Sequence, residues 1–164
     1  MPVGTGPSAM PEWRMSIGRL RVLALATSAL MLAAALNETL GYVFFILDHP
    51  GTGFQTYVPI TLIGAVPFLV TGLLIGLAAR GLAPGSGSSE QLVQRIRMAS
   101  GFGLLPIAIG GFWSGLGLAF LGADSNSTTG IAVFVYQFIL VAAVLADLAV
   151  LVASLLVKPA PISS

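Results

Sequence analysis

The chain has 164 residues, of which 56% are hydrophobic and 8% charged, and its formal net charge is +1. Because soluble domains carry about 25% charged residues, this composition excludes an ordinary water-soluble protein, and the low net charge argues against nucleic acid as a partner. Cysteine is absent and His49 is the only histidine, which excludes disulfides, thiolate metal centres and a bis-histidine haem within one chain. We therefore predict no metal site and no cofactor.

Four apolar segments are each long enough to cross a bilayer. After a polar tail at residues 1–21, the predicted spans cover about 22–47, 58–79, 99–121 and 131–157, and residues 158–164 form a second tail. Each span is close to the ~20 apolar residues that a ~30 Å hydrocarbon layer requires. The predicted fold class is an all-α integral membrane protein, a four-transmembrane-helix bundle with the lipid bilayer as its surroundings.

The basic residues all fall on one side of this arrangement. They are Arg14, Arg19, Arg21, Arg80, Arg95, Arg97 and Lys158. The positive-inside rule then predicts that both termini and the loop 80–98 are cytoplasmic. We expect a multi-pass protein of the cell membrane, and specifically of a prokaryotic plasma membrane.

Two local patterns refine the ends of the spans. Ser88 and Gln91 fit a capping box, which predicts a helix that runs through Arg97 into the third span. Ala33-Ala34-Ala35, after two arginines and an apolar run, resembles a signal-peptide cleavage site and would leave three spans. The apolar stretch continues to Leu47, which favours an uncleaved first span.

Small residues four positions apart predict where the helices approach one another, because close backbone contact drives helix association in lipid. The predicted packing residues are Ala29, Ala33 and Gly41 in the first span, Gly72 and Gly76 in the second, and Gly111, Gly115 and Ala119 in the third. Pro67 and Pro106 lie inside spans and each removes a backbone donor, which frees the carbonyl of Ile63 or Phe102. The pattern fits a compact bundle or a homo-oligomer.

Glu38 is the most informative residue, because a carboxyl group deep in a span is rare and expensive to insert. Asn37 is adjacent, Tyr42 follows one turn later, and Thr39 can bond back to its own helix. No basic side chain lies within the spans. Glu38 is therefore either a proton- or sodium-responsive coupling residue, or a neutral carboxyl group satisfied at a helix contact.

Asp147 is a second carboxyl group inside a span, and its neighbours in the fourth span are mostly small alanines. It too has a structural and a functional interpretation. Counting from the span centres separates it in depth from Glu38 by roughly 10 Å, so a shared-proton pair is not expected. One interpretation is a hydrogen bond between helices or subunits. The other is a second relay point, which water would link to the cytoplasm.

No catalytic constellation is present, since the chain lacks a serine–histidine–acid set, a metal-ligand cluster and a phosphate-binding loop. We predict that the protein is not an enzyme. The favoured function is a non-catalytic accessory subunit of a larger respiratory or transport complex, whose partner chains would face Glu38 and Asp147. The alternative is a small homo-oligomeric transporter or channel, coupled to protons or cations through Glu38.

Overall fold

The structure, a computed structural model, describes residues 15–48, 54–82, 89–120 and 128–157. Side chains are described throughout these ranges except at residues 45, 48, 54–58, 60–61, 111, 113–120, 128–134 and 136–137. Four helices account for nearly all of it: α1 (Ile17–Asp48), α2 (Phe54–Gly81), α3 (Ser89–Phe120) and α4 (Thr128–Leu156). By length and composition, all four could cross a membrane.

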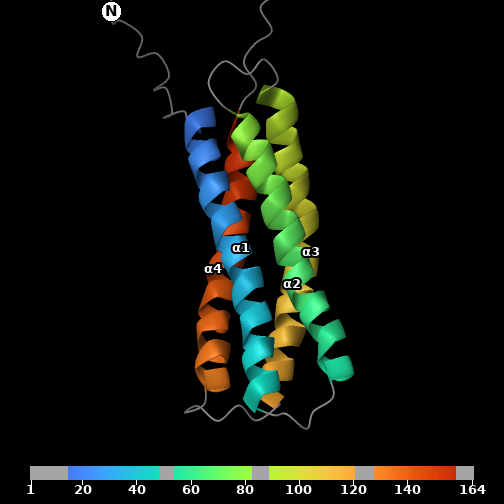
Figure 1. Cartoon of the computed structure of the whole chain (residues 1–164). Helices are drawn as coiled ribbons and strands as arrows, with labels where there is room; N and C mark the ends of the chain where they lie inside the picture. Colours follow the sequence, from blue (N-terminus) through green and yellow to red (C-terminus); the bar gives the residue numbers. More distant parts are fainter. Residues whose placement is uncertain (1–14, 49–53, 83–88, 121–127, 158–164) are drawn as a thin grey trace, which may run out of the picture.

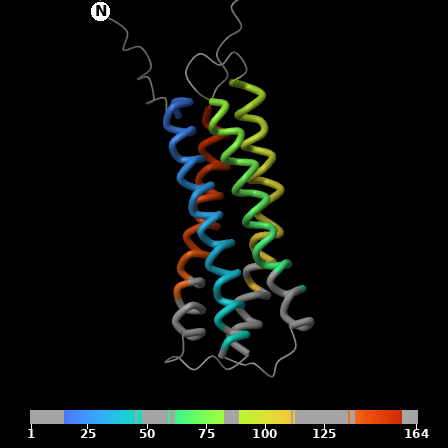
Figure 2. The backbone as a smooth tube through the Cα atoms, in the orientation of Figure 1, coloured from blue at the N-terminus to red at the C-terminus, as the bar shows by residue number. Residues whose placement is uncertain are grey.

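The helices run side by side in alternating directions (Figure 1). Each helix packs against its neighbours in sequence, and α4 closes the bundle by packing against α1. The start of α1, the end of α2, the start of α3 and the end of α4 therefore meet at one end of the molecule, which Figure 2 shows as the upper end. We call this the basic end, because Arg19, Arg21, Arg80, Arg95 and Arg97 lie there.

The helices are longer than the predicted spans. α1 begins at Ile17 and not at residue 22, so part of the predicted tail is helical. α3 begins at Ser89 and continues without a break through Arg97, which confirms the helix predicted from the capping pattern. Ser88 itself lies outside the described residues. Both Pro67 and Pro106 are accommodated inside their helices.

Each helix has a buried inner face, on which apolar side chains lie together with a few polar ones, and an exposed outer face of large apolar side chains. The core contains Leu20, Met31, Phe68, Ile75, Ile96, Ile107 and Val150. Leucine, valine and phenylalanine side chains such as Leu77, Phe102 and Leu145 are more than half exposed. Helices that are apolar on every face are typical of a bundle that is surrounded by lipid.

Glycines of α2 and α3 allow the close approaches between neighbouring helices. A methyl group at Gly72 would lie 3.0 Å from Cβ of Met31, and one at Gly76 would collide with the Ser28 hydroxyl. A methyl group at Gly103 would meet the Thr71 side chain. Gly72 and Gly76 thus lie at a helix contact, between α2 and α1.

Of the predicted small-residue stripe on α1, only Gly41 is buried within the single chain. Ala29 and Ala33 are exposed, and a methyl group at the buried Gly41 would meet nothing within 4 Å. The contact face instead carries Thr27, Met31, Ala34 and Glu38. A four-residue spacing cannot distinguish a buried stripe from an exposed one when the whole helix is apolar. Gly111, Gly115 and Ala119 lie among the residues whose side chains are not described.

Candidate functional site

Glu38 lies inside the bundle and is only 1% exposed. Its carboxyl group packs directly onto Gly64 of α2, where even a single methyl group would collide with both carboxyl oxygens. Gly64 is itself buried. The absence of a side chain at position 64 therefore creates the space that the carboxyl group occupies, between α1 and α2.

A carbonyl group of α2 lies beside this carboxyl site. Pro67 has no N–H group to offer the Ile63 carbonyl, so this oxygen lacks the usual partner within the helix. The oxygen points at Gly110 of α3, where a methyl carbon would lie 2.5 Å from it and 3.6 Å from Cα of Gly64. This geometry suits a Cα–H···O contact, which only glycine permits at such a distance. Glu38, Ile63, Gly64 and Gly110 form what we call the Glu38 site.

The predicted neighbours of Glu38 differ in their burial: Tyr42 is buried, Asn37 is half-buried and Thr39 is exposed. Tyr42, one turn further along α1, is 4% exposed and so shares the buried face with Glu38. The Asn37 side chain is half-buried, and its amide nitrogen has no hydrogen-bond partner. Thr39 donates a hydrogen bond of 2.8 Å to the Ala35 carbonyl, as predicted for a hydroxyl that bonds back to its own helix.

A second polar region, closer to the basic end, links all four helices. Thr27 donates to the Ala146 carbonyl at 3.4 Å and Ser28 to the Gly72 carbonyl at 2.7 Å. Thr71 packs on Gly103, and Ser100 faces the Asp147 carboxyl group. We call this set the polar ring; its side chains are those of Thr27, Ser28, Thr71, Ser100 and Asp147, and all are buried.

Asp147 is the only ionisable member of the polar ring, and its side chain is fully buried. Neither of its carboxyl oxygens has a hydrogen-bond partner of good geometry, and the Ser100 hydroxyl has none either. A buried carboxylate without partners is expensive in a medium of low dielectric constant. Asp147 is thus either protonated or close to a cation that the ring oxygens can help to bind.

An apolar layer separates the polar ring from the Glu38 site. Met31, Phe68, Ile107 and Ala143, one from each helix, have no exposed surface. Thr27 and Glu38 are eleven positions apart on α1, or ~16 Å at ~1.5 Å per residue. Glu38 and Asp147 therefore belong to two distinct sites, and the structure does not bring them together.

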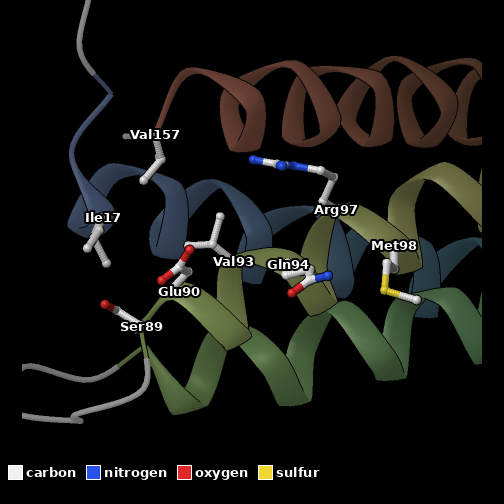
Figure 3. A pocket seen from close by; sticks show the side chains of 8 residues that line it. All are labelled: Ile17, Ser89, Glu90, Val93, Gln94, Arg97, Met98 and Val157. Carbon is white, nitrogen blue, oxygen red and sulfur yellow. The ribbon is translucent and has the colours of Figure 1, made fainter. Parts of the chain in front are cut away.

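A cavity of about 420 Å³ opens at the basic end between α1, α3 and α4. Figure 3 shows Arg97 reaching from α3 toward α4, while Glu90 lies near the mouth of the cavity. The Arg97 guanidinium group donates to the Ser154 carbonyl at 2.8 Å. The residues that line the cavity extend along α3 as far as Arg97 and Met98, and Arg97 precedes Ser100 of the polar ring by about one helical turn.

Sequence reasoning found the two carboxyl groups but missed the residues that surround them. Thr27, Ser28, Thr71 and Ser100 each lie in an apolar span, where a single hydroxyl side chain is common and therefore carries little signal. Their depths in the predicted spans differ as well, since Ser100 lies next to the start of its span and Thr71 lies eight residues from the end of its own, so no sequence signal groups them. Gly64 was overlooked because no small residue lies four positions away from it on α2.

Comparisons with known protein families, with characterised proteins and with solved structures found no match to this chain. Within the described residues, no group of three or more histidine, aspartate or glutamate side chains could hold a metal ion. The features of the molecule that bear on its function are therefore the two buried carboxyl sites and the surface of the bundle.

Proposed function

We propose that the protein is a multi-pass integral membrane protein of the cell membrane, with both termini and the loop 80–98 in the cytoplasm. Four helices of sufficient length and apolar outer faces support the insertion. The gathering of the described arginines at the basic end supports the orientation, because arginine is retained on the cytoplasmic side. A prokaryotic plasma membrane remains the expected location.

We further propose that the protein is a small proton- or cation-coupled transporter or channel in which Glu38 is the coupling residue. The observation that carries this proposal is the burial of the Glu38 carboxyl group against Gly64, within the bundle of a single chain. A carboxyl group on the outer face of the bundle could receive a hydrogen bond or a positive charge from a partner chain. The Glu38 carboxyl group must receive it from within its own bundle. Intramembrane carboxyl groups with this placement are typical of proton and ion pathways.

The polar ring supplies the second half of the proposed pathway. From the cytoplasmic cavity, an ion or proton would pass Arg97 and reach the buried Asp147 carboxyl group, which faces the Ser100 hydroxyl. The apolar layer formed by Met31, Phe68, Ile107 and Ala143 then closes the route to Glu38. In the proposed mechanism this arrangement is the closed state, and transfer between the two sites requires movement of this layer.

The test is flux through purified protein in liposomes. Wild-type protein should collapse an imposed pH or sodium gradient, read out by an internal pH dye or by radioactive sodium uptake. Glu38→Gln removes the charge with little change in volume, so we expect flux to fall by at least ten-fold while the protein remains folded. Glu12→Gln makes the same change in the predicted N-terminal tail, outside the predicted spans, and should retain flux.

Either of two results would contradict the coupling role. One is a wild-type protein that carries neither protons nor sodium, and the other is a Glu38→Gln variant that transports as well as the wild type. Asp147→Asn extends the test to the polar ring and should also reduce flux. A folded state is verified for each variant by its elution from a sizing column.

A non-catalytic accessory subunit of a larger respiratory or transport complex is the second candidate. The apolar layer favours it, because a fully packed layer between the two carboxyl sites is also what a purely structural bundle would have. Purification in mild detergent followed by native mass spectrometry separates the two. Foreign subunits in fixed ratio would support the accessory role, and a homo-oligomer of this chain alone would support the transporter.

A further inference from the structure

A long apolar groove lies between α2 and α3 on the outside of the bundle; neither Glu38 nor Asp147 lines it, and Thr71 is the one member of the polar ring that does. The volume of the groove is about 670 Å³. Leu74 and Leu77 of α2 line it together with Met98 and Phe102 of α3, and Pro67 and Pro106 lie at its inner end. Among the described residues that line the groove, only Arg95 is charged.

The groove has the length of one lipid leaflet. Arg95 and Pro106 are eleven positions apart on α3, which corresponds to ~16 Å along the helix. Half of a ~30 Å hydrocarbon layer is ~15 Å. If Arg95 lies at the headgroup level, as its place at the basic end indicates, the prolines lie near the middle of the bilayer. An acyl chain of one leaflet therefore matches the groove from end to end.

The charge at the mouth of the groove selects the headgroup. Arg95 is exposed at this mouth, and Arg80, three positions beyond Leu77, is exposed in the last turn of α2. Arg97 is directed elsewhere, since it donates to a carbonyl of α4. A guanidinium group binds phosphate through paired hydrogen bonds, and basic sites between helices on the cytoplasmic side recognise anionic headgroups.

We propose that this groove is a binding site for one anionic phospholipid, with an acyl chain along α2 and α3 and its phosphate on Arg95. Arg80 strengthens the attraction without lining the groove. The inference rests on the proposed insertion in a membrane but not on ion coupling, because the groove is separate from Glu38 and Asp147. The bound lipid would stabilise the contact between α2 and α3, including the packing of Thr71 on Gly103.

The test uses the full chain in nanodiscs of equal parts phosphatidylglycerol and phosphatidylcholine. Native mass spectrometry after release should show one retained phosphatidylglycerol in preference to phosphatidylcholine. Arg95→Gln should reduce this preference about five-fold, the effect of roughly one surface arginine on anionic lipid. Arg19→Gln removes an exposed arginine from α1 at the same end and should leave the preference unchanged.

A pair of adjacent substitutions tests the groove itself. Leu74→Trp fills the groove and should abolish retention of the lipid, whereas Leu73→Trp, at a similarly exposed neighbour that does not line it, should not. Equal retention of both lipids, unchanged preference in Arg95→Gln, or a different bound molecule would each overturn the proposal. Release of the wild-type chain from membranes by alkaline carbonate would instead show that membrane insertion had failed.

Discussion

Glu38 and Gly64 act as one unit, because the carboxyl group of the first occupies the volume that a side chain on the second would need. Gly64→Ala should therefore lower the thermal stability of the detergent-solubilised protein, by an amount equivalent to about 1–3 kcal/mol for overpacking. The loss should appear despite the gain of up to ~1 kcal/mol that alanine usually brings to a helix interior. Thermal unfolding monitored by circular dichroism provides the measurement.

The control for this prediction is a double-mutant cycle. Glu38→Ala removes the carboxyl group, so Gly64→Ala should cost much less in that background than in the wild type. Gly18→Ala offers a further reference, since a methyl group there would meet nothing within 4 Å. Equal effects of Gly64→Ala with and without Glu38 would show that the two residues are not coupled.

At the scale of the helices, α3 carries two glycines whose surroundings are opposite. A methyl group at Gly103 would collide with the Thr71 side chain of α2, whereas one at Gly101 would meet open space. We expect Gly103→Ala to destabilise the bundle by about 1–3 kcal/mol and Gly101→Ala to be neutral or slightly stabilising. Titration with a denaturing detergent, followed by circular dichroism, measures both.

A substitution at Thr71 tests whether the stability lost in Gly103→Ala comes from the collision with the Thr71 side chain. Combining Gly103→Ala with Thr71→Ala removes the two atoms nearest to the new methyl group, so the double variant should recover part of the lost stability. If Gly101→Ala destabilises as much as Gly103→Ala, the helices do not pack at Gly103 as described. The two substitutions are chemically identical and two positions apart, which makes the comparison sharp.

The sequence was sufficient to predict the number of helices but not their rotation about their own axes. Span prediction needs only the length and hydropathy of a segment, which is why four helices were found at nearly the right places. Rotation needs a contrast between faces, and an apolar helix such as α1 offers none. Within the single chain the predicted Ala29 and Ala33 lie on the exposed side of α1, while Met31 and Ala34 fill the core.

In the candidate sites, too, the sequence was sufficient to identify the unusual residues but not the residues that pack around them. Glu38 and Asp147 were recognised because a carboxyl group is exceptional in a span. The glycines and hydroxyl groups around them are ordinary residues of apolar helices, and only the pairing of α1 with α2, and of α3 with α4, places them beside the carboxyl groups. Their function depends on neighbours that are remote in the sequence.

For the whole molecule, the one-sided arrangement of arginines makes the orientation a direct prediction. The chain contains no cysteine, so single cysteines can be introduced without any background. Ser127→Cys, between α3 and α4, should react with a membrane-impermeant maleimide in intact cells, because this loop is predicted to face outward. Ser88→Cys, between α2 and α3, should react only after the cells are permeabilised. Labelling of Ser88→Cys from outside would invert the topology, and the Arg97 cavity would then face the outside instead of the cytoplasm.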